Sequence, residues 1–279
     1  MVILPLSAGY VLSANLDTLR SEAWGESTRE NLPRATFEKA RNLFERTLSK
    51  TAEISDLKKD WAVLGMDLLE VGSSEEGFLV VKERNESRFG RGFYAIRNNA
   101  QNAHLWEAPH SRSDRFTGDI VMKLFLESQA RAGAWNTTPR KQADLAHLEG
   151  SFFQAFTDAF ASKFPNGLIV QVHGFLADKR TTPQGRRGGL IISDGTKTPG
   201  PRAIRFHQQL SSRITEPVSL YPRQVTELGA TTNAQGRALR NVRHTGFLHI
   251  EIDFPTRNSL SKSRMLRAAL LESATDSYP

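Results

Sequence analysis

Polar residues that could bind a metal or move a proton stand at the ends of apolar segments. His110 and His173 each follow an apolar run typical of a β-strand, and Glu251 lies inside a third such run. In open α/β sheets, ligands bind at the carboxyl ends of strands, so side chains at these ends are expected to converge. Two histidines in these positions are what a metal site on the rim of a sheet requires.

The third ligand is expected to be a carboxylate close to His110. Asp114 is four residues further on, just before a helix predicted at 117–132, so its side chain could fold back toward the histidine. The Asp-x-x-Thr pattern at a helix start is also that of an N-cap. Glu107 is the competing acid, because it lies on the strand that precedes His110 and could point to either face of the sheet.

Glu251 is the candidate for proton transfer. A carboxylate in a central strand is costly unless it is used. Beside a metal-activated water it could accept a proton and pass it to a leaving amine. The alternative is an edge strand on which His249, Glu251 and Asp253 face water. His249 shares a strand face with Glu251 and is therefore a candidate neighbour of the site.

Substrate binding is expected to involve arginine. Arg140 follows a short apolar segment and could hold a substrate carboxylate through two parallel hydrogen bonds. His244, in a long polar segment at 223–246, could also contact substrate, since long loops in compact domains are often functional. The other arginines that could bind the substrate carboxylate are Arg180, Arg186, Arg187 and Arg257.

The segments that must position these residues alternate between strand and helix after residue 103. Apolar runs and helical spacing predict strands at 103–109, 134–136, 167–172, 189–193 and 247–254, and helices at 117–132, 145–164, 203–214 and 260–271. This alternation is typical of an α/β fold with a mixed, largely parallel sheet flanked by helices.

The first hundred residues differ from the remainder. We expect a polar loop at 15–33, helices at 34–50 and 56–71, and a strand pair at 78–81 and 93–96. Residues 1–100 would form an N-terminal helical arm packed on a main domain at 101–279.

The amino-acid composition limits the kinds of metal site and nucleophile that the chain can contain. The chain has 279 residues, no cysteine, and 37 Lys and Arg against 30 Asp and Glu, for a net charge of +7. Without cysteine, thiolate zinc sites, iron–sulfur clusters and cysteine nucleophiles are excluded, so a metal must bind to His, Asp or Glu. The charge is too small to indicate a specific nucleic-acid partner, and no apolar run reaches the roughly 20 residues of a membrane span.

The sequence is compatible with more than one cellular compartment. Residues 1–14 are apolar, but they lack a basic start and are interrupted by Pro5, which makes a poor signal peptide. The chain could equally be cytoplasmic or exported after removal of a signal.

The order of these motifs resembles the N-formylglutamate amidohydrolase family, which is related to zinc carboxypeptidases and aspartoacylases. The matching pieces, over roughly residues 103–258, are Pro109-His110-Ser111, Arg140 with Asp144, the strand ending at His173-Gly174, and Ile250-Glu251-Ile252. The chain departs from the family pattern at Arg112, where Gly is usual, and at Ala146-His147, where Asn-Arg is usual. Carboxypeptidases use His-x-x-Glu, whereas the interval here is His-x-x-x-Asp.

The resemblance implies a sheet of about eight strands and one Zn²⁺ per chain held by His110, His173 and an acid, for which Asp114 is our candidate. It also implies Glu251 as the general base and Arg140 as the clamp for a carboxylate. The substrate would be a small anionic amide or a peptide, cleaved at an amide bond near the carboxylate.

Two other interpretations compete with a metal-dependent hydrolase. The first is a catalytically inactive module whose loops at 180–187 and 223–243 bind an anionic polymer or a partner protein. The second is a hydrolase with Ser111 or Ser193 as nucleophile, although neither serine lies in a Gly-x-Ser-x-Gly elbow.

Overall fold

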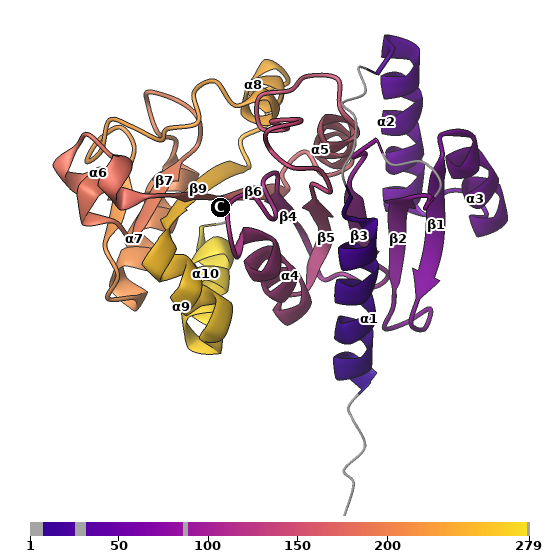
Figure 1. Cartoon of the computed structure of the whole chain (residues 1–279), viewed down its shortest axis with the longest axis horizontal. Coiled ribbons are helices and arrows are strands. Elements are labelled where there is room, and N and C mark those ends of the chain that lie inside the picture. The colour runs from indigo at the N-terminus through magenta and orange to yellow at the C-terminus, as the bar shows by residue number, and fades with distance from the viewer. Residues whose placement is uncertain (1–7, 26–31, 86–88, 278–279) are drawn as a thin grey trace, which may run out of the picture.

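A computed structural model describes residues 8–25, 32–85 and 89–277. These residues form a nine-stranded sheet with helices on both faces (Figure 1). The strand order is β1-β2-β3-β5-β4-β6-β9-β7-β8. The expected α/β fold is therefore confirmed, with nine strands in place of about eight.

The sheet is mixed, and its parallel part lies at the centre. Strands β5, β4, β6 and β9 are parallel neighbours, whereas β1, β2 and β3 add an antiparallel meander on one side and β7 pairs antiparallel with β9 on the other. The strands are β1 (Met66–Val71), β2 (Phe78–Glu83), β3 (Phe93–Arg97), β4 (Asn102–Ala108), β5 (Ala130–Trp135), β6 (Leu168–Phe175), β7 (Leu190–Ser193), β8 (Val218–Leu220) and β9 (Phe247–Asp253).

Two helical layers cover the sheet (Figure 1). One contains α1 (Ala8–Ala23), α4 (Thr117–Glu127), α7 (Pro201–Arg213), α9 (Phe254–Lys262) and α10 (Arg264–Asp276). The other contains α2 (Arg34–Ser49), α3 (Ile54–Val63), α5 (Phe152–Lys163) and α8 (Ala234–Asn241). A short 3₁₀ turn, η1 (Ala177–Lys179), and α6 (Pro183–Arg187) follow β6.

Strand alternation divides the interior into two cores. In β6, Leu168, Val170 and Val172 face the core under α4 and α7, whereas Ile169 faces the core under α2 and α5. Because side chains alternate along a strand, Gln171 and His173 share the face of Ile169. On that face, the carboxyl halves of β4, β6 and β9 carry buried polar side chains in place of apolar ones, namely Glu107, Gln171, His173, His249 and Glu251.

Some predicted elements have other boundaries in the structure. The helix predicted at 56–71 is wrong in its second half, where the chain turns at Gly65 with φ of +67° and continues as β1. The helix predicted at 145–164 begins only at Phe152, because Gly150 has φ of +69° and Ser151 caps the helix by accepting a hydrogen bond from the Gln154 N–H.

Other differences lie near the two ends of the chain. The loop predicted at 15–33 begins as part of α1, and the helix predicted at 260–271 is divided between α9 and α10. The segment at 223–246 contains α8, which the Asn233 side chain caps. The signal-peptide interpretation of the first residues falls partly on 1–7, outside the described residues.

The first hundred residues supply α1, α2 and α3, and their three strands extend the same sheet that carries β4 to β9. A separate domain boundary near residue 100 stays a prediction. Among the described residues, no helix combines the length and apolar character needed to cross a membrane.

Candidate metal centre

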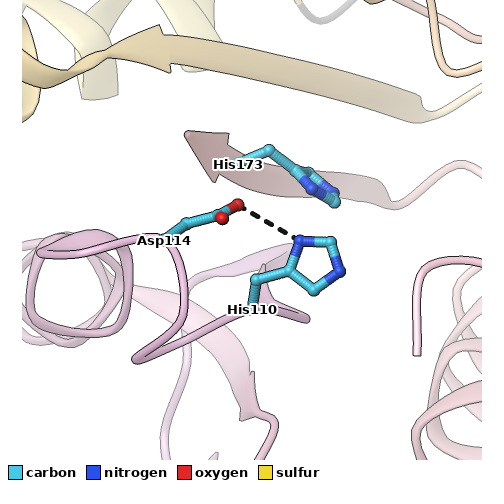
Figure 2. A group of neighbouring side chains, drawn as sticks. All are labelled: His110, Asp114 and His173. Carbon is cyan, nitrogen blue, oxygen red and sulfur yellow. Dashed lines mark hydrogen bonds and ion pairs between the residues drawn. The ribbon is translucent and has the colours of Figure 1, made fainter. Parts of the chain in front are cut away.

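His110, Asp114 and His173 converge at the carboxyl ends of β4 and β6 (Figure 2). Each offers one nitrogen or oxygen atom within 4.8 Å of the others, and all three side chains are buried. His110 and Asp114 lie in the turn between β4 and α4, whereas His173 lies on β6 itself. The sequence prediction that these three residues lie together is therefore consistent with the geometry.

Both ring nitrogens of His110 are engaged. Nδ1 lies 3.1 Å from Asp114 Oδ2, and Nε2 lies 2.8 Å from Asp144 Oδ1. Burial alone would lower the pKa of His110, but the hydrogen bonds with the two carboxylates outweigh it and raise the pKa. Burial opposes ionisation of Asp144, yet the hydrogen bond and charge of His110, with those of Arg140, lower the pKa of Asp144 to about 2.

Asp114 faces His110 and does not cap the following helix. Helix α4 is preceded by Phe116, whose φ is +76°, and its first turn has no side-chain cap. Asp114 Oδ2 instead accepts a hydrogen bond from the Gly174 N–H at 3.0 Å. The N-cap alternative is therefore wrong, and the carboxylate is fixed between His110 and β6.

Glu107 lies away from the group formed by His110, Asp114 and His173, which we call the ligand cluster because all three are potential metal ligands. Its carboxylate accepts hydrogen bonds from the Thr157 hydroxyl at 2.6 Å and from the Gln171 amide at 2.9 Å. Burial raises the pKa of Glu107 to about 7, against the effect of these two hydrogen bonds. Among the described residues, no group of potential metal ligands includes Glu107.

Gln171 fixes the orientation of His173. Gln171 Nε2 donates to Glu107, and Gln171 Oε1 accepts a hydrogen bond from the Asn233 amide at 2.8 Å. The same Oε1 lies 3.2 Å from His173 Nε2, so this nitrogen must carry the proton. His173 Nδ1 is then unprotonated. Burial and the nearby charges of His249 and His110 lower the pKa of His173 well below its ordinary value, which keeps the ring neutral.

Glu251 lies beside the cluster on a central strand. Strand β9 is paired with both β6 and β7, so the interpretation of residues 247–254 as a solvated edge strand is wrong. Glu251 is opposite His173 in register and forms a second potential ligand group with His173 and His249. Burial, and then the charge of Asp114, raise the pKa of Glu251 to about 8.

His249 and Glu251 each retain an unused polar atom. Glu251 Oε1 lies 3.8 Å from His249 Nε2, whereas Glu251 Oε2 and His249 Nδ1 are buried with no hydrogen-bond partner in the described part of the chain. Burial, with the charges of His110 and His147, lowers the pKa of His249 to about 3. A neutral histidine and an unsatisfied carboxylate oxygen therefore border the cluster.

Three of the residues expected to bind substrate, Arg140, Arg257 and His244, have different surroundings. Arg140 Nε lies 3.0 Å from Asp144 Oδ2 and its Nη1 lies 3.8 Å from Asp114 Oδ1, and the Arg140 side chain is 44% exposed. Arg257 is buried and donates to the carbonyl oxygens of Phe175 and Arg115. The structure does not bring His244 to the cluster: it lies before β9 and contacts the Phe164 carbonyl, at the opposite edge of the sheet.

The two candidate serine nucleophiles donate to backbone carbonyls. Ser111 Oγ bonds to the Asn136 carbonyl and Ser193 Oγ to the Gly229 carbonyl at 2.7 Å. Both hydroxyls are buried, and these hydrogen bonds hold loops together. This arrangement favours a structural role for both serines.

Two supporting residues lay outside the sequence prediction of the site. Asp144 belongs to the motif near Arg140, but nothing in its spacing indicated a hydrogen bond to His110. Gln171 precedes His173 by two residues, and on a strand this spacing places both on one face. That spacing was the available signal for Gln171.

The donor set fits a zinc ion. Two imidazoles and one carboxylate are the ligands of many catalytic zinc sites, which keep a further position for water or substrate. The Nε2 atoms of both histidines already have oxygen acceptors, a carboxylate for His110 and an amide for His173. Such partners orient metal-binding histidines and fix their tautomer. The two Nδ1 atoms and the Asp114 carboxylate, which contacts His110 Nδ1, are then the atoms that could bind the ion.

No protein-family model and no curated protein matches the chain. Among solved structures, an N-formylglutamate amidohydrolase from Ralstonia eutropha JMP134 is 12% identical, with a TM-score of 0.48 over 67% of this chain and 98% of that one. A succinylglutamate desuccinylase from Chromobacterium violaceum is 12% identical, with a TM-score of 0.42 over 82% and 72% of the two chains.

An aspartoacylase family protein from Mesorhizobium loti is 10% identical, with a TM-score of 0.42 over 76% of this chain and 70% of that one. The similar structures thus include the classes of protein that the sequence resemblance named. Identities and TM-scores at these levels bear on neither substrate nor mechanism, so the functional proposal rests on the residues of the site.

Proposed function

We propose that this protein is a zinc-dependent hydrolase that cleaves an amide bond near a carboxylate, in an N-acyl amino acid or a peptide. The observation that carries the proposal is the convergence of His110, Asp114 and His173 beside the buried Glu251. A ligand set and an adjacent acid–base group are the two parts that metal-assisted hydrolysis needs.

His110, Asp114 and His173 would hold the ion. When bound, zinc would polarise the scissile carbonyl, lower the pKa of the attacking water and, by its charge, favour the ionised form of Glu251. The protein contributes fixed ligands, since Asp144, Gln171 and the Gly174 N–H each hold one ligand side chain in place.

Glu251 would act as the general base. Its carboxylate lies beside His173, and burial makes it a stronger base than an exposed carboxylate. It would take a proton from water and then give that proton to the leaving amine nitrogen. The positive charges of His110, Arg140 and Arg180 act against the raised pKa and favour the ionised base.

Arg140 would bind the substrate carboxylate. Its Nε is paired with Asp144, and its exposed side chain leaves further guanidinium N–H groups for an anion. A bidentate contact would place the amide bond next to the ligand cluster. Arg257 is better suited to a structural role, because its guanidinium already bonds to two carbonyl oxygens.

Metal content tests the proposal most directly. We would measure zinc by elemental mass spectrometry on the wild type, on His173→Ala and on His207→Ala, which changes a half-buried histidine on α7 outside the cluster. The expected result is about one zinc per chain in the wild type and the control, and its loss in His173→Ala. No zinc in any of the three after dialysis against zinc would contradict the proposal and favour an inactive binding module.

Activity is the second part of the test. The zinc-loaded wild type would be assayed on N-acyl amino acids and short peptides, each beside an analogue whose carboxylate is replaced by an amide. Hydrolysis that requires the carboxylate and is lost in His173→Ala would support the proposal. A zinc-loaded protein that hydrolyses none of these compounds would contradict the enzymatic part.

A further inference from the structure

A cavity lies at the amino ends of the central parallel strands, opposite the strand ends that carry His110, Asp114 and His173. It has a volume of about 640 Å³, within the range of small-molecule sites. His244 and Thr245 line it just before β9 begins, and Asp194 lines it just after β7 ends. Because β7 and β9 are antiparallel, the end of β7 and the start of β9 lie on the same side of the sheet, where both strands can line one cavity.

The cavity is lined by cations. Its lining includes the arginines Arg202, Arg205, Arg240 and Arg243, with Asp194 as the acidic side chain. Asp194 already accepts hydrogen bonds from Thr196 through Oδ1 and from the Gly200 N–H through Oδ2. The one carboxylate in the lining is therefore engaged in holding its own loop, and the cavity keeps an excess of positive charge.

Arg240 has a guanidinium nitrogen that nothing satisfies. Its Nη2 bonds to the Thr231 carbonyl at 3.4 Å, but its Nη1 is buried with no hydrogen-bond partner among the described residues. Gly195 and Gly236 adjoin Nη1, and the space that a Cβ would need at each is partly occupied by it. A buried donor without a partner is costly, so a shift of the Arg240 side chain that brings Nη1 to an acceptor on a ligand in the cavity would be favourable.

Arg205 also lines the cavity, and its guanidinium lies near a neutral carbonyl oxygen. Its Nε and Nη2 lie 3.4 and 3.3 Å from the Ser277 carbonyl. Helix α7 begins in the lining at Pro201, after Gly200, without a side-chain cap. The N–H groups of a first helical turn have no acceptor within the helix, and its dipole favours negative charge.

We infer that this cavity binds a small molecule that carries a phosphate group. The lining has more guanidinium groups than a single carboxylate could pair with. A phosphate has enough oxygen atoms for bidentate contacts with more than one arginine. Phe247, Ala203 and Pro201 supply apolar lining for the less polar part of the ligand. The site shares no residue with the ligand cluster, and the inference is independent of the proposed hydrolase function.

Calorimetric titration with inorganic pyrophosphate tests this inference. The protein is first stripped of metal by a chelator and dialysed, so that pyrophosphate cannot bind through a metal ion. Arg240→Gln removes the unsatisfied guanidinium, and Arg243→Glu reverses an exposed charge at the rim. The matched control is Arg237→Gln, three residues earlier on α8, where the side chain is exposed and paired with Glu149 at 2.6 Å.

The expected result is saturable binding to the wild type, weakened at least about tenfold by each cavity variant and by less than about twofold in the control. Circular dichroism checks that the variants fold, and Arg243→Glu provides the test if Arg240→Gln does not fold. Absence of binding to the wild type, or equal weakening by Arg237→Gln, would overturn the inference. So would a single-stranded oligonucleotide that binds more tightly than pyrophosphate and is weakened by the same variants, since that would assign the surface to a nucleic-acid backbone.

Discussion

His110 stands between two carboxylates, and each has a different function in our proposal. Asp114 lies on the Nδ1 side of the ring and would bind the ion, whereas Asp144 contacts Nε2 on the opposite side. Mutation of an outer carboxylate of this kind typically lowers metal affinity by about 10- to 100-fold. Asp144 is half-buried, so its removal costs less folding free energy than removal of a core residue.

Replacing Asp144 tests the outer carboxylate. We expect Asp144→Ala to weaken zinc binding by about 10- to 100-fold, because His110 Nε2 loses its acceptor. Asp144→Asn retains an oxygen acceptor and should weaken binding less. The measurement is competition with a chromogenic chelator. Equal affinities in Asp144→Ala and the wild type would show that Asp144 does not orient His110.

Replacing Glu251 separates a base from a ligand. We expect Glu251→Gln to lower kcat by about 10²- to 10⁴-fold, because the glutamine cannot accept the proton. Zinc content should stay unchanged, since the proposed ligands are other residues. If zinc is lost together with activity, Glu251 binds the ion, and the group of His173, His249 and Glu251 is the true site.

At the scale of elements, the ligand cluster depends on how closely α9 approaches β6. Arg257 on α9 reaches across Gly174, and a Cβ placed on Gly174 would lie 2.5 Å from the guanidinium carbon. The Gly174 N–H also donates to Asp114. A side chain at this position would therefore disturb both the contact with α9 and the position of Asp114, a proposed metal ligand.

Substituting Gly174 tests this close approach. We expect Gly174→Ala to lower the free energy of unfolding by about 1–3 kcal/mol and to weaken zinc binding as well. Gly200→Ala is the control, because the nearest atom to its added Cβ lies 3.4 Å away. Urea denaturation and chelator competition measure the two effects. If Gly174→Ala behaves like the control, Arg257 adapts without cost and this contact does not position Asp114.

The sequence predicted the elements that carry the proposed ligands and base better than the elements around them. Apolar runs placed His173 at the end of a strand and Glu251 within one, because buried parallel strands have a strong local signal. The change from helix to strand at Gly65 was missed because residues 56–71 also fit helical spacing, and a single glycine does not reveal its backbone conformation. The choice between cap and ligand for Asp114 depended on the φ of +76° at Phe116, which spacing cannot predict.

At the scale of the whole molecule, a network of buried hydrogen bonds links the core under α2 and α5 to the ligand cluster. Glu107 bonds to Thr157 on α5, and through Gln171 it is joined to His173 and to Gln235 on α8. Its pKa in the folded protein is about 7, raised by burial from an ordinary value of 4.5. The folded state therefore binds more protons than the unfolded state between these pH values, and folding stability from this group falls as pH rises through the window.

Glu107→Gln should remove this pH dependence. The glutamine can accept from Gln171 and donate to Thr157, so the network stays satisfied. We expect the variant to gain stability relative to the wild type on going from pH 4.5 to pH 8, by on the order of 2–3 kcal/mol. Urea denaturation of metal-free protein at both pH values measures it, with the exposed Glu75→Gln as control. If the free energies of unfolding of the wild type and Glu107→Gln change equally between the two pH values, Glu107 does not have the raised pKa.

The position of β9 in the sheet has a consequence for synthesis of the protein. Strand β9 is the last strand in the described chain, yet it lies between β6 and β7. A nascent chain that ends after β8 holds two partial sheets with nothing to join them, and domains complete their folding as units. Since Glu251 is on β9, a chain that terminates before residue 251 lacks the proposed base. The proposed hydrolysis would therefore begin only after β9 has been synthesised and has joined the two partial sheets.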